Sequence, residues 1–230
     1  MISIIIPAHR EEESLNILLS HIATVQDREG AEVIIALSPE SQTYTLNDFE
    51  GKVRLLCCKE QGRAVQMNEG SMLAKGEVLV FLHADVKPPS TFLRDINNAL
   101  SGVYDAGFFS YKFDKKNFWL SINASFTARD SIFTGGGDQC LFIRKSIFDK
   151  LGKFDQHQLL MEDFEFFKRM KQALIPYTII KRDLIVSARK YERNSYLRVN
   201  LSNLLLVILF NLGFSSTRLK FIHDKLIHSS

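Results

Sequence analysis

The first hundred residues alternate between short apolar runs and longer segments in which apolar residues recur at helical spacing. The continuous runs predict buried strands over residues 3–7, 32–37, 53–57 and 77–85. The periodic segments predict helices over residues 11–25, 62–75 and 90–100, with Gly76 as the cap that ends the second helix. Strands that alternate with helices are typical of an α/β domain with a mainly parallel sheet and helices on both faces.

The second half of the chain is less regular. We expect strands over residues 107–113, 177–180 and 184–187, and a glycine loop that runs into a strand over residues 135–143. We expect helices over residues 118–132, 146–151, 162–174, 195–212 and 215–227. No internal repeat or long linker divides the chain, so the sequence predicts a single domain over residues 1–230.

In parallel α/β sheets, ligands bind at the carboxyl ends of the strands. Those ends are residues 7–10, 38–40 and 83–85 here. Asp85 stands at the end of the fourth predicted strand. It can hold a divalent cation beside a substrate phosphate, because Mg²⁺ and Mn²⁺ take one or two carboxylates together with phosphates and water. It can instead cap the turn that follows.

Two segments in the second half of the chain also carry candidate chemistry. Glu162 and Asp163 open a predicted helix, where a carboxylate can serve as a general base or can simply complement the helix dipole. The glycine loop 135–137 precedes Asp138 and Gln139 and can cradle a substrate or form a tight turn.

Basic residues suggest where a phosphate would bind. Arg63 lies at the predicted N-terminus of the helix that carries Gln66 and Asn68, where it can pair with a diphosphate or face solvent. Arg189 follows the last predicted strand and can neutralise a leaving group or belong to a surface charge cluster. The six histidines form no zinc-binding pattern, and no serine lies in the Gly-x-Ser-x-Gly elbow of serine hydrolases.

Composition and charge narrow the class of protein. The chain is 46% hydrophobic and carries a net charge of +3, which does not indicate nucleic-acid binding. Residues 181–230 hold nine Lys or Arg and three Asp or Glu, a basic tail that can face phosphates, an anionic membrane or solvent. Three cysteines fit no disulfide framework, so we expect a reducing, cytoplasmic location.

The apolar run 204–210 is too short to span a membrane, and the first residues do not resemble a signal peptide. The helix that contains this run is apolar nearly all round. That pattern is typical of a helix that is buried or faces a second copy in a homo-oligomer, and with its basic neighbours it can also lie at a membrane surface.

Taken together and in order, the motifs resemble the family 2 glycosyltransferases of the GT-A fold, and a bacterial subgroup of them in particular. The segments that carry the resemblance are Ser-Ile-Ile-Ile-Pro with Glu11 (3–11), Gly-Arg-Ala-Val-Gln-Met-Asn-Glu-Gly (62–70), Phe-Leu-His-Ala-Asp (81–85), Gly-Asp-Gln (137–139), Met-Glu-Asp (161–163) and Ser-Ala-Arg-Lys-Tyr (187–191). They cover about residues 2–215.

The resemblance implies a nucleotide-diphospho-sugar donor, a hydroxyl acceptor of unknown identity and a bound Mg²⁺ or Mn²⁺. It implies a nucleotide-binding half (about 1–100), an acceptor half (about 101–192) and C-terminal helices (about 193–230). Asp85 would bind the metal, and Asp163, beside Glu162, would be the base of an inverting single displacement. The residues implied to contact the donor or line its pocket are Pro7, Ala8, Glu11, Ser38, Gly62, Arg63, Gln66, Asn68, Asp85, Asp138, Gln139 and Arg189.

Three positions depart from the pattern of many relatives. Ser38 stands where they place an Asp that reads the donor base, His83 replaces the first Asp of an Asp-x-Asp metal motif, and Lys190-Tyr191 replaces Arg-Trp. Two alternatives therefore stay open at this level. One is a nucleotidyltransferase, although the residues after the first strand lack its glycine-rich loop. The other is a non-catalytic protein that binds nucleotide sugars.

Overall fold

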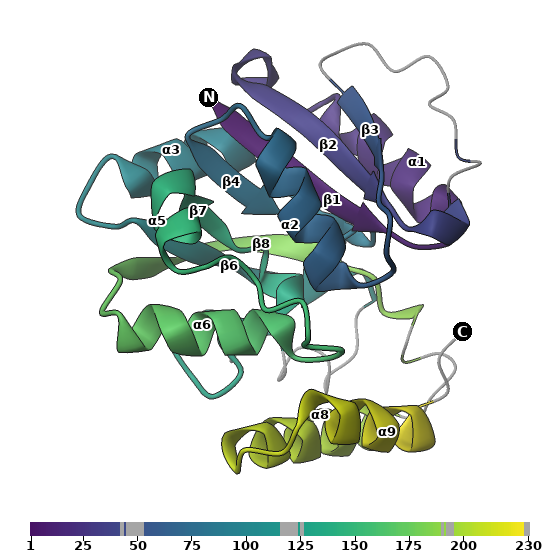
Figure 1. Cartoon of the computed structure of the whole chain (residues 1–230). Helices are drawn as coiled ribbons and strands as arrows, with labels where there is room; N and C mark the ends of the chain where they lie inside the picture. The colour runs from purple at the N-terminus through teal and green to yellow at the C-terminus, as the bar shows by residue number, and fades with distance from the viewer. Residues whose placement is uncertain are drawn as a thin grey trace.

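A computed structural model of the chain describes residues 1–41, 44, 53–115, 124, 127–189, 191 and 196–227. Most of the helix predicted over residues 118–132 lies outside this set, as do Lys190 and residues 192–195. The described part contains a twisted sheet with helices on both faces and a helical hairpin at its C-terminal end (Figure 1).

The first hundred residues fold as their apolar pattern predicts. The elements are β1 (Ile2–Ala8), α1 (Glu12–Ile22), β2 (Ala31–Leu37), β3 (Val53–Cys57), α2 (Arg63–Leu73), β4 (Val78–Phe81) and α3 (Phe92–Leu100). Every residue of β1 and β2 is buried, which explains why these strands have continuous rather than alternating apolar sequences.

The second half adds β5 (Val86–Lys87), β6 (Ala106–Phe113), β7 (Phe142–Arg144), α5 (Lys145–Lys150), α6 (Glu162–Gln172), β8 (Tyr177–Val186), α8 (Tyr196–Asn211) and α9 (Ser216–Leu226). The two short strands predicted over residues 177–187 are one strand, β8. It pairs with β6 across a register shift between Phe109 and Tyr111, and this irregularity accommodates the polar residues that interrupt its apolar pattern.

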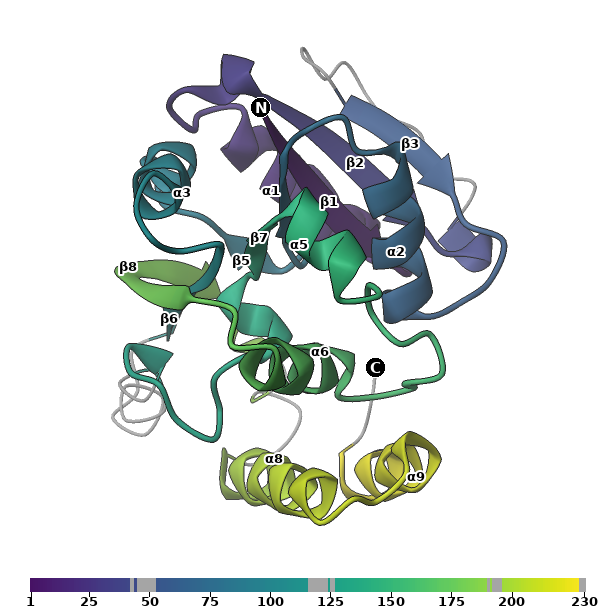
Figure 2. The ribbon, with the colours of Figure 1, turned by 60° about the vertical axis from the view of Figure 1, so that its left-hand side comes forward.

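The eight strands form one sheet in the order β3-β2-β1-β4-β7-β6-β8-β5. Strands β3, β2, β1 and β4 are parallel, whereas β7 runs antiparallel to both β4 and β6. One apolar core lies between the sheet and helices α1 and α3, and the other lies between the sheet and helices α2, α5 and α6 (Figure 2). The predicted α/β architecture with helices on both faces is confirmed.

Gly76 does not end α2 as predicted. The helix ends at Leu73, and the backbone of the next residue, Ala74, is extended (φ −64°, ψ 128°). The Gly76 N–H donates to Ser3 Oγ at 2.8 Å, and a Cβ on this glycine would lie 2.7 Å from the Met1 carbonyl oxygen and from Ser3 Oγ. The glycine is therefore required by the close passage of the chain beside β1, and not by a left-handed cap.

Helices α8 and α9 pack side by side and project from the body below α6 (Figures 1 and 2). Arg198 Nε donates to the Leu226 carbonyl at 2.5 Å, which ties the two ends of this hairpin together. Within the described residues, we find no helix with the length and apolar character needed to cross a bilayer.

Candidate active site

The carboxyl ends of β1, β2 and β4 meet at one edge of the sheet, as the parallel pairing requires. Directly after β1, His9 Nδ1 lies 2.8 Å from Ser38 Oγ, which directly follows β2. Gln61, just before α2, approaches the other ring nitrogen of His9 at 3.4 Å. Pro7, Ala8 and Ser38 form the floor beneath this group, and all three are buried. Our sequence analysis did not select His9 or Gln61, although both lie at predicted strand ends or helix starts.

Gln66 fastens two of these strand ends together. Its side-chain nitrogen donates to the Ala8 carbonyl at 2.9 Å and to the Ala36 carbonyl at 2.6 Å, and the side chain is buried. Gly62, immediately before α2, adopts φ +146°, a backbone conformation that L side chains rarely adopt. Gln66 thus serves the strand ends, and Gly62 allows α2 to begin beside them.

A cluster of charged side chains lies beside the end of β4. Arg63, at the start of α2, places Nη1 3.4 Å from Glu162 Oε1 at the start of α6. The Glu162 side chain is buried, whereas that of Arg63 is 52% exposed and can reach a ligand. His83 Nδ1 lies 3.6 Å from Asp138 Oδ1, so the cluster joins α2, α6, the end of β4 and the glycine loop.

Gly137 is the point around which this cluster closes. A Cβ on Gly137 would lie 2.2 Å from His83 Cε1 and 2.6 Å from both His83 Nε2 and Asp163 Oδ2. Only a residue without a side chain leaves room for the histidine and the carboxylate together. The same loop packs on α6 through Gly135, where a Cβ would lie 2.7 Å from the Phe167 side chain.

The carboxyl groups of the cluster have raised pKa values. Burial and the charge of Glu162 raise the pKa of Asp163 to about 7. Burial and the charge of Asp138 raise the pKa of Asp85. Burial and the charge of Asp85 raise the pKa of Glu11, against the smaller opposing effects of nearby cations. Burial is the largest cause in each case, and a neighbouring carboxylate adds to it.

The pKa of His83 is also raised. Burial and the charge of Arg63 lower its pKa, but the hydrogen bond to Asp138 and the charges of Asp163 and Asp138 outweigh them and raise it. The sequence placed His83 at a strand end and in a family motif without assigning it a role. A group that gains a proton here offsets part of the carboxylate charge.

Arg189 lies after β8. Its side chain is exposed, and its backbone N–H donates to Ser187 Oγ at 3.3 Å. Its charge is among those that act on Glu11, which places it within electrostatic reach of the site.

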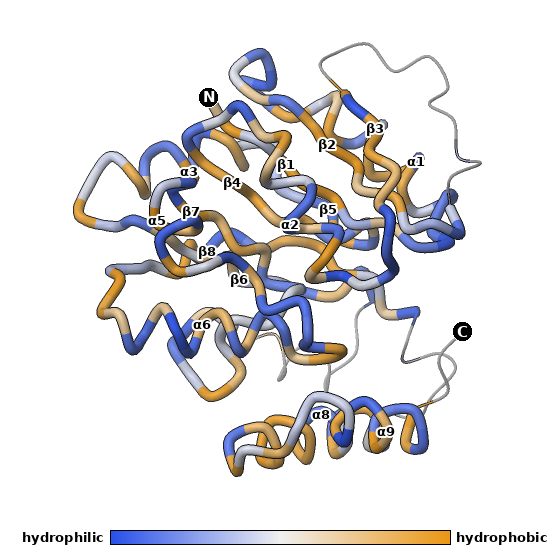
Figure 3. Tube along the Cα trace, viewed as in Figure 1, coloured by the Kyte–Doolittle hydropathy of each residue, from blue (hydrophilic) through white to orange (hydrophobic). Residues whose placement is uncertain are grey.

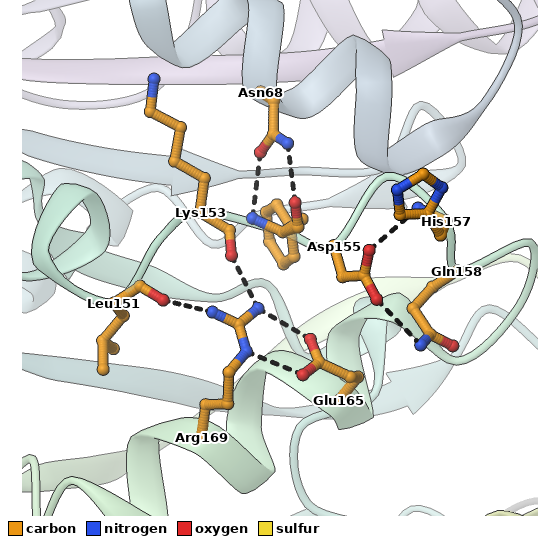
Figure 4. Close-up of polar contacts among 9 residues, drawn as sticks. Asn68, Leu151, Lys153, Asp155, His157, Gln158, Glu165 and Arg169 are labelled. Carbon is orange, nitrogen blue, oxygen red and sulfur yellow. Dashed lines mark hydrogen bonds and ion pairs between the residues drawn. The ribbon is translucent and has the colours of Figure 1, made fainter.

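Like Gln66, two further residues that we expected to contact the donor have side chains that hydrogen-bond to the backbone. Gln139 is buried, accepts from the Gly135 N–H at 2.9 Å and donates to the Thr127 carbonyl at 3.1 Å. Asn68 donates to the Phe154 carbonyl at 2.8 Å and accepts from the Phe154 N–H at 3.0 Å (Figure 4). The first holds the glycine loop, and the second holds the segment between α5 and α6.

That segment is held from its other side by Arg169 of α6 (Figure 4). The guanidinium donates twice to Glu165, each time at 2.7 Å, and also donates to the carbonyls of Leu151 and Lys153. Lys153 has a left-handed backbone (φ +62°), which these contacts support. Asn68 and Arg169 together fix the approach to Glu162 and Asp163.

The carboxylates offer oxygen ligands for a hard cation, but they do not form a complete cage. Among the described residues, no group of three or more histidine, cysteine, aspartate or glutamate side chains is arranged to hold a metal by itself. Asp85 and Asp138, whose charges act on each other, supply oxygen donors of the kind that Mg²⁺ and Mn²⁺ prefer. This donor set fits a divalent cation that shares its ligands with a phosphate-bearing substrate.

Comparison with known proteins gives one family match. The model of the family described as "Glycosyl transferase family 2" matches residues 3–152, which is more than half of the chain. No curated protein matches the chain significantly.

Several solved structures share the fold. S. aureus TarS 1-349 in complex with UDP-GlcNAc superposes with a TM-score of 0.67 at 15% identity, over 98% of this chain and 71% of that one. The mannosyltransferase PcManGT from Pyrobaculum calidifontis, in complex with GDP-Man and Mn²⁺, gives 0.60 at 17% identity, over 98% and 69%. The catalytic domain of Drosophila beta1,4galactosyltransferase 7 gives 0.55 at 16% identity, over 84% and 73%.

Proposed function

The chain belongs to glycosyl transferase family 2, and on that basis we propose that it transfers a sugar from a nucleotide-diphospho-sugar to a hydroxyl acceptor, with inversion at the anomeric carbon. Family membership and the GT-A neighbours make it a glycosyltransferase and remove the support for a nucleotidyltransferase. The observation that carries the proposed mechanism is the meeting of Asp163, Arg63 and Asp85 at the carboxyl ends of the parallel strands.

The donor would bind along the ends of β1 and β2. Structural neighbours hold UDP-GlcNAc or GDP-Man, so a nucleoside diphosphate joined to a sugar is the class of ligand to expect. Its base and ribose would lie near Pro7, Ala8 and Ser38, where His9 and Gln61 add hydrogen-bonding groups. Glu11 would lie between the nucleoside and the metal.

The diphosphate would lie against Arg63, because a helix N-terminus and an arginine both attract phosphate. Arg63 is half exposed and is already oriented by Glu162. Arg189, whose charge also acts on Glu11, would stabilise the charge that grows on the departing diphosphate. Both residues were candidates for this contact in the sequence.

A divalent cation would be held by Asp85, with Asp138 as the neighbouring carboxylate. When bound, Mg²⁺ or Mn²⁺ supplies positive charge that stabilises a leaving diphosphate. Burial, and then the charge of a neighbouring carboxylate, raise the pKa values of Asp85 and Glu11, and a cation bound beside them would favour their charged forms. A neighbour that holds Mn²⁺ with its donor adds support.

Asp163 would accept the proton of the acceptor hydroxyl. The hydroxyl oxygen would form a bond to the anomeric carbon as the bond from that carbon to the diphosphate oxygen breaks, and the nucleoside diphosphate would leave with the electron pair. A carboxyl with a pKa near 7 is a stronger base than an ordinary aspartate. Glu162, buried beside it, would hold Arg63 and keep the Asp163 pKa high.

The proposal is tested by thermal unfolding of the whole chain with nucleoside diphosphates and nucleotide sugars, each with and without Mn²⁺. We expect one family of bases to raise the unfolding temperature, and Mn²⁺ to increase the shift. Asp85→Ala should remove the Mn²⁺-dependent part. Asp149→Ala, which changes an exposed aspartate on α5, is the matched control.

The outcomes distinguish the metal assignment from the donor site itself. Stabilisation by a nucleotide sugar that survives Asp85→Ala unchanged would contradict the metal assignment. The absence of any shift would contradict the donor site and favour a protein that has lost it. Release of nucleoside diphosphate from the donor that gives the largest shift then tests transfer or hydrolysis directly.

A further inference from the structure

The outer face of α8 is an apolar stripe that nothing in the described chain covers. Leu201 and Leu212 are 63% and 70% exposed, and Leu204, Leu205 and Ile208 are also exposed. Spacings of three and four residues place the four helical residues on one side of α8, and Leu212 follows its last residue, Asn211. The opposite side, which carries Val199, Ser202, Leu206 and Val207, is buried. The helix is apolar all round, but only half of it is used in packing.

The second helix of the hairpin adds cations and an aromatic ring to the exposed surface. Arg218, Phe221 and Lys225 of α9 are exposed and recur at spacings of three and four residues. Lys225 Nζ lies 4.3 Å from the centre of the Phe221 ring, so the two side chains share one patch. Arg198 begins the stripe on α8, three residues before Leu201, and is exposed as well.

The described hairpin, residues 196–227, contains four Lys or Arg and a single acidic residue, Asp224. No acidic residue lies on α8 itself. The hydropathy of the chain shows the hairpin as a band of apolar segments interrupted by hydrophilic ones, set apart from the body (Figure 3). We define the hairpin surface as the α8 stripe together with the exposed residues 218, 221 and 225 of α9.

We propose that the hairpin surface docks on an anionic lipid surface. Apolar and aromatic side chains on one side of a helix, with Lys and Arg beside them, are the composition of helices that lie in the plane of a membrane interface. At 16 residues, α8 is shorter than the roughly 20 residues that a spanning helix needs. It would therefore lie along the surface.

Charge favours lipid over a second copy of the chain. A two-fold contact would bring the same excess of cations together from both copies, and like charges across an interface oppose association. An anionic leaflet offers the opposite charge, and each Lys or Arg near it strengthens binding. The apolar stripe alone would suit either partner, so the cations decide between them.

The hairpin is connected to the element that carries the proposed base. Ser216 Oγ donates to the His157 carbonyl at 3.0 Å, in the segment that leads to α6. The Phe210 ring lies 6.4 Å from that of Phe164, next to Asp163. Docking would thus hold the proposed active site at a set position relative to the lipid surface.

The experiment is flotation of the whole chain with vesicles, without any substrate, so that its result does not depend on sugar transfer. One set of vesicles is phosphatidylcholine, and the other is phosphatidylcholine mixed with phosphatidylglycerol. We expect binding to the anionic set, weaker binding as salt rises, and little binding to the neutral set.

Two variants divide the surface. Arg218→Gln with Lys225→Gln should lower the partition coefficient about 30-fold, from the contribution of two cations near an anionic surface. Ile208→Glu with Leu212→Glu should abolish binding. Leu174→Glu with Val103→Glu is the control, because these residues are 87% and 78% exposed on other parts of the molecule. Every changed residue is exposed, and the unfolding temperature checks that each variant folds.

No binding to anionic vesicles would overturn the proposal, and so would binding that the two hairpin variants leave unchanged. Sedimentation of the chain without lipid tests the alternative partner, a second copy of the chain. The chain could instead form a dimer that Ile208→Glu with Leu212→Glu dissociates, and fail to bind vesicles. That result would assign the stripe to a second copy and would also overturn the proposal.

Discussion

Among single residues, Asp163 shows how the environment alters a common side chain. It is a partly buried carboxyl beside a second carboxylate, Glu162, and its pKa rises to about 7. Acidic residues favour the first turn of a helix, and at the sequence level that explanation competed with catalysis. The contact of Glu162 with Arg63, and the approach of Asp163 to Gly137, show that both carboxylates face the site.

Because the pKa of Asp163 is raised, we expect a rise in pH to increase activity and to decrease the stability of the folded chain. In the wild-type chain, kcat/KM should rise as pH passes through about 7, because the base must be unprotonated. The folded pKa lies above that of the unfolded chain, so the folded state loses stability as pH rises from about 4 to about 7. Asp163→Asn removes this cost while it removes the base.

We therefore expect Asp163→Asn to abolish transfer, to leave donor binding nearly unchanged, and to raise the unfolding temperature by a few degrees at pH 8. The gain in stability should shrink toward pH 5. Thermal unfolding at both pH values measures the stability, and release of nucleoside diphosphate at both pH values measures the transfer. A variant that is less stable than wild type at pH 8 would indicate that Asp163 is held by favourable contacts and is not a strained base.

At the scale of elements, α2 shows how one short helix organises the site. Its first residue, Arg63, points to the cluster, Gln66 joins the ends of β1 and β2, and Asn68 holds the loop before α6. Gly70 allows the helix to approach β1, since a Cβ there would lie 2.6 Å from the Ile5 side chain. The helix therefore sets the position of α6 relative to the sheet, and with it the distance from Arg63 to Asp163.

This arrangement makes Asn68 a positioning residue. Asn68→Leu keeps the shape of the side chain but leaves the backbone N–H and carbonyl of Phe154 without their partner, at a cost of about 1–3 kcal/mol in stability. We expect kcat to fall about tenfold and the KM for the donor to change little. Steady-state kinetics over a range of donor concentrations measures both.

Asn97→Leu on α3 replaces an exposed asparagine and is the matched control. An increase in the KM for the donor as large as the fall in kcat would show instead that Asn68 contacts the donor, as the resemblance implied.

At the scale of the whole molecule, the candidate site draws on segments from both halves of the chain. Glu11, Arg63 and Asp85 come from the first hundred residues, and Asp138 and Asp163 come from the second half. The sheet joins these halves without interruption, since β4 pairs with β7 and β7 with β6. A ligand in the site would therefore stabilise the halves together.

We expect a single unfolding transition that a bound nucleoside diphosphate with Mn²⁺ moves as a whole. At a ligand concentration 100 times its Kd, the gain in unfolding free energy is about 2.7 kcal/mol. Hydrogen exchange should slow at the starts of α2 and α6 in parallel. Two transitions, of which the ligand moves only one, would show that the halves unfold as separate domains.

Much of the fold is predictable from the sequence because its signals are local. A continuous apolar run such as that of β1 is buried wherever it pairs, and the spacing of Leu15, Leu18 and Leu19 places one face of α1 on the sheet. Parallel pairing then brings the residues after β1, β2 and β4 to one edge, so the location of the site and several of its charged residues follow from topology.

The remaining features depend on partners that are far apart in the chain. Nothing local to Asn68 indicates that it bonds the backbone of Phe154, 86 residues away, or that Gln139 supports the glycine loop from within. Both amides look like ligand contacts until their partners are known, because a buried amide must satisfy its hydrogen bonds somewhere. Gly76 is similar, since only the passage of β1 beside it explains the glycine.

By itself, then, the sequence determined the α/β architecture, the edge of the sheet at which the candidate site lies, and the charged residues that stand at that edge, because these depend on periodicity and strand order. Only the tertiary structure decided the partners of the buried amides, the raised pKa of Asp163 and the side of α8 that stays uncovered. Hydrogen bonding, desolvation and exposure are properties of atoms brought together by folding, and a linear pattern does not contain them.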